Sequence, residues 1–223
     1  MNLKKSRTLL ILLLYIFGMF FMPYLSNILL VGVLKLTDVA LVTVLTNFIS
    51  YIFLFLMVIL LFKDDLRLDF KRISSPKHFF IEIMKGECLV YFAMIVSNLI
   101  LLYGFNLTDN SQNQTLIEDV MVLHPILMSS TTVLLAPVIE EVVFRFTVMG
   151  QSKLNPTVAL ILSSVLFGLI HVVSAGDYIY VIPYLTMGLA LGYVYKRSQN
   201  IWYPIGVHFL QNLLSTLLIF ITL

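Results

Sequence analysis

Seven stretches of this chain are long, apolar and almost free of charge. They cover approximately residues 8–34, 39–62, 88–105, 120–148, 156–173, 178–195 and 204–223. A helix needs about 20 mostly apolar residues to cross roughly 30 Å of hydrocarbon, and it satisfies its own backbone polar groups there. With 60% hydrophobic and 12% charged residues, the chain carries more apolar surface than a small soluble core can bury. The sequence therefore predicts an all-α, polytopic transmembrane helix bundle of about seven spans. Some stretches are short, so six full crossings and one partial crossing would also fit.

The chain is expected to form a single transmembrane domain over residues 1–223. The first three helices occupy about residues 8–105, and a core that holds the polar motifs occupies about residues 120–223. The first stretch follows Lys4, Lys5 and Arg7, as the apolar part of a signal peptide does. It is too long for that role and no small-residue cleavage site follows it. We expect a retained first helix that is bent or broken near Pro23.

The distribution of basic residues predicts the orientation of the chain. Of its 14 Lys and Arg residues, twelve lie before the first stretch or in the connections that share its side of the membrane. Lys35 lies in a connection on the other side, and Arg145 lies inside a stretch. Basic loops stay in the cytoplasm, so we expect a cytoplasmic N-terminus and an external C-terminus.

Two connections have a composition of their own. Residues 63–87 mix charged with apolar side chains, which fits either an amphipathic helix on the cytoplasmic face or a solvated loop. Residues 106–119 contain no Lys or Arg and are predicted to form an outer loop.

Ionisable and amide side chains inside the apolar stretches are the strongest functional signal. Such groups are costly in hydrocarbon, so those that occur tend to mark functional sites. Here they fall in three stretches, and they are Glu140, Glu141, Arg145, His171, His208 and Asn212. The alternative is a purely structural polar network.

Helical spacing suggests roles for the acidic pair. Glu141 and Arg145 are four residues apart and share a helix face, so they can form a buried ion pair. Glu140 points about 100° away from Glu141. It is the carboxylate left free for chemistry, and we interpret it as a general base.

The histidines extend this hypothesis. Phe167 and His171 share one helix face, and His208 and Asn212 share another. Such groups can orient water and donate to a developing oxyanion. Glu140, His171 and His208 are equally a reasonable set of ligands for a divalent metal such as zinc. Spacing does not decide between these alternatives, because the residues come from three helices.

Three short motifs resemble those of a known family. Glu140-Glu141-Val142-Val143-Phe144-Arg145 is similar to the E-E-x-x-x-R motif of the CPBP family, which contains the type II CAAX prenyl endopeptidases and the bacterial Abi proteins. Phe167–His171 is similar to its F-x-x-x-H motif, and His208–Asn212 to its H-x-x-x-[ND] motif. The resemblance covers about residues 125–215.

The resemblance implies an intramembrane protease of the metalloprotease class, although it leaves open whether a metal is needed. In such a protein Glu140 and His171 would activate water, and His208 and Asn212 would hold the oxyanion. Glu141, Arg145 and Phe167 would support the site.

The depth of these residues predicts where the cavity opens. Counted from the cytoplasmic ends of their helices, Glu140 is about nine residues in, His171 about fifteen and His208 about five. At about 1.5 Å per residue this is a spread of roughly 15 Å, which tilting must level. We then expect a cavity that opens toward the cytoplasmic half.

Three functions compete. The first is an endopeptidase that cuts a membrane-associated peptide or protein near the cytoplasmic face. The second is a binding protein, such as one for bacteriocin self-immunity, that does not depend on catalysis. The third, a transporter that uses Glu140 as a proton relay, lacks repeat symmetry and paired broken helices.

The expected partners are membrane lipid and a peptide or protein substrate. A prenylated protein, a peptide signal or a bacteriocin precursor would fit, and no nucleic-acid partner is expected. The short chain favours a bacterial member of the family, located in the cell membrane.

Overall fold

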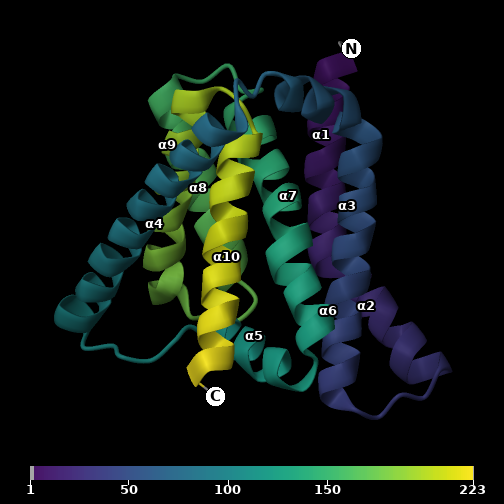
Figure 1. Cartoon of the computed structure of the whole chain (residues 1–223). Coiled ribbons are helices and arrows are strands. Elements are labelled where there is room, and N and C mark those ends of the chain that lie inside the picture. Colours follow the sequence, from purple (N-terminus) through teal and green to yellow (C-terminus); the bar gives the residue numbers. More distant parts are fainter. Residues whose placement is uncertain (1–2, 223) are drawn as a thin grey trace.

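The computed structural model describes residues 3–222, and among them helices connected by short loops account for the whole fold (Figure 1). In chain order the elements are α1 (Leu3–Ile16), η1 (Phe17–Phe21), α2 (Met22–Asn27), η2 (Ile28–Val33), α3 (Val39–Lys71), α4 (Pro76–Phe105), α5 (Gln112–Leu123), α6 (Pro125–Ser129), η3 (Ser130–Leu135), α7 (Ala136–Glu140), η4 (Glu141–Met149), α8 (Pro156–Val172), η5 (Tyr178–Tyr180), α9 (Val181–Ser198) and α10 (Trp202–Thr222). The side chains of Lys4 and Lys5 lie outside the described residues.

Among residues 3–222, six helical runs are long and apolar enough to cross a membrane, and α8, with 17 residues, is a shorter seventh. The two ends of the chain lie at opposite ends of the bundle (Figure 1), as an odd number of crossings requires. Large apolar side chains such as Leu60, Phe92 and Ile221 are more than half exposed on its outside. The prediction of a multi-pass membrane bundle is thus confirmed. Its orientation across the membrane stays a prediction.

The first span runs from α1 to η2 and contains two segments with wide, π-helical turns. One of them, η1, directly precedes α2, whose second residue is Pro23. Proline lacks an N–H and its ring clashes with the preceding turn, so the helix widens there instead of ending. The predicted disturbance near Pro23 therefore takes the form of a local widening.

The connection expected at residues 63–87 is almost absent. α3 continues to Lys71 and α4 begins at Pro76, where Ser75 caps the first turn by accepting a hydrogen bond from the amide of His78 at 3.2 Å. Neither an independent surface helix nor a solvated loop forms. The charged residues instead continue α3 and α4 beyond the apolar stretches, and the last turns of α3 run across the end of the bundle that holds the N-terminus (Figure 1).

The expected outer loop and the start of the fourth span also differ from the prediction. Ser111 caps α5 by accepting from the amide of Gln114 at 3.2 Å. His124, whose backbone is not helical, separates α5 from the span that begins at Pro125. The apolar residues from Val120 to Leu123 belong to this short helix, and the fourth span is Pro125–Met149.

A hydrogen-bonded clamp joins α3 to α10 at the end of the bundle that holds the N-terminus. The backbone carbonyl of Asp69 accepts from the amide of Asn200 at 2.7 Å, and its carboxylate accepts from the N–H of Ile201 at 3.0 Å. The indole of Trp202 donates to the carbonyl of Leu66 at 2.8 Å. These contacts hold the start of α10, and so His208, against the rest of the bundle.

α8 and α9 pack closely because small residues face each other. A Cβ atom on Gly188 would lie 3.1 Å from the Cα atom of Ser164. Ser163 and Ser164 are fully buried, and the hydroxyl of Ser163 donates to the carbonyl of Phe144 at 2.8 Å. Small residues allow such backbone approach in membrane bundles.

Candidate active site

Glu140 and Glu141 lie where the fourth span changes its helical geometry. Glu140 ends α7 and Glu141 begins η4, whose turns are π-helical. The widening is visible at its end, where the N–H of Gly150 donates to the carbonyl of Arg145 five residues earlier, at 2.8 Å. Wide turns inside helices often occur at functional sites. Here the wide turns begin at Glu141, directly after Glu140.

Glu141 and Arg145 form the ion pair that their spacing predicts. The Oε2 atom of Glu141 lies 3.2 Å from Nε of Arg145, and both side chains are fully buried. Nη2 of Arg145 donates to the backbone carbonyl of Gly188 at 3.2 Å, and its guanidinium carbon lies 4.4 Å from the ring centre of Phe167. Arg145 thereby ties the fourth span to α8 and α9.

Glu141 also contacts His208, which the sequence did not indicate. Its Oε1 atom lies 2.9 Å from Nδ1 of His208, whose side chain is 4% exposed. Because Arg145 pairs with the same carboxylate, we infer that Nδ1 carries the proton and donates. This bond fixes the imidazole ring and directs its Nε2 atom toward Glu140.

His171 is held in a comparable way by the backbone of its own helix. Its Nδ1 atom lies 2.7 Å from the carbonyl oxygen of Phe167, which can only accept, so Nδ1 is the donor. The ring stacks on Tyr184, with centroids 4.5 Å apart and planes 17° apart. In the neutral ring the lone pair is on Nε2, which faces Glu140.

Glu140, His171 and His208 meet at one carboxylate oxygen. Oε2 of Glu140 lies 3.9 Å from Nε2 of His171 and 4.0 Å from Nε2 of His208. Both separations exceed a hydrogen bond, yet one water molecule can contact both atoms of either pair. Oε2 is buried and has no hydrogen-bond partner among the described residues, so it is free to accept from such a water.

The other oxygen of Glu140 is occupied by a residue that the sequence analysis missed. The hydroxyl of Tyr51, on α3, donates to Oε1 at 3.2 Å. Tyr51 lies in the middle of an apolar span, and a buried tyrosine hydroxyl usually finds a hydrogen-bond partner. This is the one feature of the sequence that could have indicated it. Tyr15 also lines the site and buries its hydroxyl, which has no hydrogen-bond partner among the described residues.

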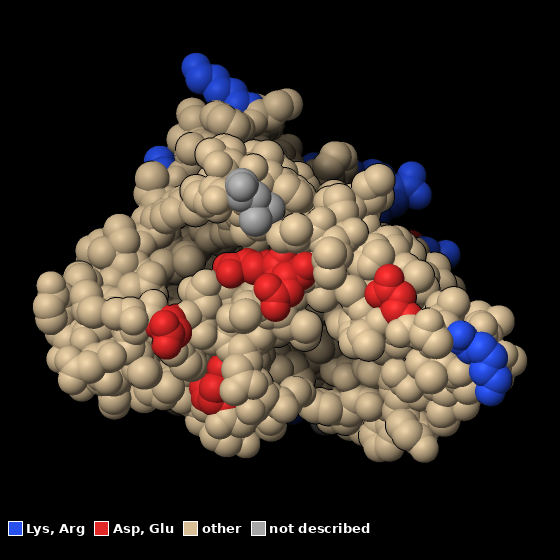
Figure 2. Space-filling model, turned by 90° about the horizontal axis from the view of Figure 1, so that it is seen from below, with Lys and Arg blue, Asp and Glu red and all other residues tan. Residues whose placement is uncertain are grey.

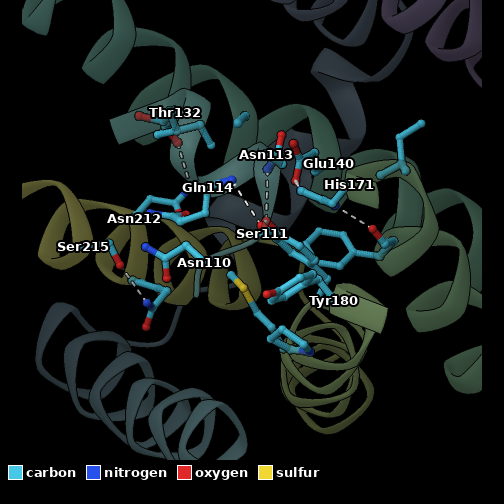
Figure 3. A pocket seen from close by; sticks show the side chains of 18 of the residues that line it. Asn110, Ser111, Asn113, Gln114, Thr132, Glu140, His171, Tyr180, Asn212 and Ser215 are labelled. Atoms are coloured by element: carbon cyan, nitrogen blue, oxygen red, sulfur yellow. Dashed lines mark hydrogen bonds and ion pairs between the residues drawn. The ribbon is translucent and has the colours of Figure 1, made fainter. Parts of the chain in front are cut away.

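Asn212 lies near the site, and one hydrogen of its side-chain amide is already used in a hydrogen bond. Its Nδ2 atom donates to the carbonyl of Thr132 at 2.8 Å (Figure 3). An amide carries two hydrogens on this nitrogen, so one hydrogen is left for another acceptor. The structure thus brings Glu140, His171, His208 and Asn212 to one cavity, with Phe167 buried behind the histidines.

That cavity has a volume of about 370 Å³ and passes between α4, α5, α9 and α10 (Figure 3). Three of its lining residues are exposed, namely Asn98, Asp109 and Asn110. All three lie toward the end of the bundle that holds the C-terminus. The sequence predicted that the cavity opens at the same end as the basic connections; in the structure it opens at the opposite end. The depths of the site residues along their own helices gave no indication of α5, whose residues form the mouth of the cavity.

The positions of the donor atoms bear on the predicted metal site. The residue types suit zinc, but donors that share a tetrahedral zinc lie roughly 3.3 Å apart, given bonds of about 2.0 Å. The two separations from Glu140 are 3.9 and 4.0 Å. Within residues 3–222, no group of three His, Cys, Asp or Glu side chains is arranged to hold a metal ion. The side chains as positioned do not fit the ion.

Comparison with known proteins agrees with the motifs. Residues 122–214 match the family model described as type II CAAX prenyl endopeptidase Rce1-like. The chain is 30% identical to a protein of Bacillus subtilis named membrane peptidase YdiL, over 57% of this chain and 51% of YdiL. It is 30% identical to UPF0177 protein YxdF of Lactococcus lactis, over 56% of this chain and 70% of YxdF.

A further relative is named membrane-embedded CAAX protease MroQ, from Staphylococcus aureus. It is 25% identical over 70% of this chain and 65% of MroQ. The match thus spans about half the length of YdiL and about two thirds of the other two relatives. No solved structure gave a significant match.

Proposed function

Because the chain belongs to the Rce1-like family of type II CAAX prenyl endopeptidases, we propose that it is an intramembrane endopeptidase that uses Glu140 to activate water. The observation that carries the proposal is the oxygen Oε2 of Glu140. It is buried, has no hydrogen-bond partner within residues 3–222, and lies 3.9 and 4.0 Å from two imidazole nitrogens. A general base must reach the proton that it removes through a hydrogen bond.

In the proposed reaction a water molecule lies between Glu140 and His171. Oε2 of Glu140 takes one of its protons, and Nε2 of His171 accepts the other in a hydrogen bond that orients the oxygen. The oxygen attacks the peptide carbonyl carbon and forms a tetrahedral oxyanion. When this intermediate collapses, the carbon–nitrogen bond breaks and the proton on Glu140 passes to the leaving amine.

Asn212 and His208 are the proposed donors to the oxyanion. Asn212 offers the amide hydrogen that Thr132 does not use. His208 can donate from Nε2 only when both ring nitrogens carry protons, because Nδ1 is bound to Glu141. Preorganised donors at this point stabilise the transition state and are worth about 100- to 1,000-fold in kcat each.

The alternative is a binding function, such as bacteriocin self-immunity, that uses the same cavity without catalysis. The experiment that separates the two uses the full chain in nanodiscs and quenched fluorescent peptides presented with lipid. Wild type is expected to cleave, and Glu140→Gln is expected to lose at least 100-fold in kcat, because the substitution keeps the shape and removes the base.

The matched control for that experiment is Glu82→Gln, which changes a partly exposed carboxylate that pairs with Lys85 on α4, outside the cavity. Its kcat should equal that of wild type. Equal cleavage by Glu140→Gln would show that another group is the base. An immunity or binding phenotype in cells that persists in Glu140→Gln would favour the non-catalytic function.

A further inference from the structure

The mouth of the cavity is built from polar side chains, although the cavity lies within a membrane bundle. Asp109 and Asn110 come from the segment before α5, and Glu118 comes from α5 itself. The carboxylate of Glu118 accepts from the amides of Asn110 at 3.1 Å and Gln114 at 2.9 Å. These contacts hold one carboxylate at the mouth and leave its negative charge uncompensated.

The whole surface around the mouth is acidic. The connections at this end, residues 34–38, 106–124 and 173–177, contain one basic residue and five acidic ones, which gives a formal charge of 1 − 5 = −4. These residues are Lys35, Asp38, Asp109, Glu118, Asp119 and Asp177. Figure 2, which views this end, shows acidic side chains across its face. In the described part of the chain none of the five acidic residues forms an ion pair with Lys or Arg.

The cavity also holds buried polar atoms that have no partner. Oε2 of Glu140 and Oε1 of Gln211 make no hydrogen bond within the described residues, and both side chains are 3% exposed. Both residues line the same cavity as Asp109 and Glu118. Buried polar groups are normally satisfied, so these acceptors indicate a cavity that receives hydrogen-bond donors.

We propose that this mouth admits the cationic, Lys- or Arg-bearing segment of a peptide, whose backbone then enters the cavity toward Glu140. The proposal rests on the proposed function and names the substrate class of the same site. Negative potential focused in a cleft attracts cations and raises their rate of encounter. Neutral amides beside the carboxylates, such as those of Asn110 and Gln114, can donate to and accept from a peptide backbone. A free inorganic cation would have no use for these amide N–H donors.

Binding of fluorescein-labelled peptides to the full-length Glu140→Gln protein tests this proposal. The protein is placed in nanodiscs of zwitterionic phosphatidylcholine, and binding to empty nanodiscs is subtracted. The peptides are N-acylated twins that carry either three Lys or three Gln beyond the same apolar segment. Glu140→Gln prevents cleavage during the measurement, so affinity is measured independently of activity.

The Lys peptide is expected to bind about fivefold to tenfold more tightly than its Gln twin at low salt. The difference should shrink at 1 M salt, where exposed charges are screened beyond about 3 Å. Adding Asp109→Asn and Glu118→Gln should bring the two affinities to within about twofold. Asp38→Asn with Asp119→Asn, which also removes two charges from this end of the bundle but outside the cavity lining, should leave most of the preference.

Equal binding of both peptides at low salt would overturn the proposal, as would a preference that survives Asp109→Asn with Glu118→Gln. Cleavage by wild type that Glu140→Gln abolishes, together with equal binding, would refute this substrate class and leave the proposed function standing. A clear Lys preference without cleavage of either peptide by wild type would support the mouth as a binding site and count against the protease.

Discussion

The carboxylate of Glu141 makes two contacts, one that supports the fold and one that holds a site histidine. It pairs with Arg145 through one oxygen and holds His208 through the other. Removing one partner of a buried ion pair leaves an uncompensated charge, which costs about 3–5 kcal/mol. A residue that only supports the fold would affect stability alone, whereas Glu141 is also expected to affect chemistry.

Glu141→Gln is therefore expected to lower stability by about 3 kcal/mol and to reduce kcat in the fraction that remains folded. Thermal unfolding in detergent and kcat in nanodiscs measure the two effects. Arg145→Met combined with Glu141→Leu should recover much of the stability, because it removes both charges, and should still fail to cleave. Full activity in this double variant would contradict the role given to the bond between Glu141 and His208.

Tyr51 gives a second prediction at this scale. It donates to Oε1 of Glu140, which leaves Oε2 free for water. Tyr51→Phe removes a hydrogen bond to a charged group, worth about 1.5–3 kcal/mol, so kcat should fall roughly tenfold or more with little change in KM. Tyr103→Phe, an exposed tyrosine on α4, is the control. An unchanged kcat in Tyr51→Phe would show that Glu140 is positioned without it.

Individual residues also show which parts of the site could be predicted from the sequence. Glu140, Glu141, Arg145, His171, His208 and Asn212 could be selected because ionisable and amide groups stand out in apolar spans. Tyr51 and Tyr184 could not, since tyrosine is common in membrane helices and their partners are distant in the chain. The contact of Glu141 with His208 joins residues 67 positions apart, and only the packing of the helices reveals it.

At the scale of helices, the approach of α8 and α9 positions both His171 and the carbonyl of Gly188 that receives Arg145. The sequence identified the helices themselves, since apolar length predicts a span. It did not reveal where they begin and end, because α3 and α4 continue through charged residues that lie beyond the hydrocarbon. Nor did it reveal the π-helical turns, which depend on packing and on Pro23 and Pro137.

Gly188→Ala tests this helix contact. The added Cβ would lie 3.1 Å from the Cα atom of Ser164, where backbone cannot give way easily. Overpacking of this kind costs about 1–3 kcal/mol, and α9 should shift away from Arg145. Thermal unfolding should show the loss, and activity should fall with it. Gly104→Ala, whose Cβ would meet its nearest neighbour at 4.0 Å, should be neutral. Equal stability of both variants would contradict the close contact.

The whole molecule is strongly polarised in charge. Beside the formal charge of −4 around the mouth, the end that holds the N-terminus collects twelve basic residues and five acidic ones, or 12 − 5 = +7. Basic connections stay in the cytoplasm. The cavity would then open on the external side, and not toward the cytoplasm as the depth of the site residues in the sequence suggested.

Cysteine labelling tests this orientation. In a Cys88→Ser background, Thr108→Cys should react with a membrane-impermeant maleimide in intact cells, because the connection after α4 would be external. Ser152→Cys, in the connection before α8, should react only after the cells are opened. The reverse pattern would show that the N-terminus and the basic end are external.

The shortness of α8 has a consequence for the surrounding bilayer. Its 17 residues extend roughly 26 Å at 1.5 Å per residue, less than the roughly 30 Å of a typical hydrocarbon core. A short span is accommodated by local thinning of the membrane beside it. His171 is the penultimate residue of this helix, so the length of the lipid acyl chains should affect the proposed catalysis. Thicker bilayers should strain α8 and slow the reaction. Thinner bilayers should remove this strain.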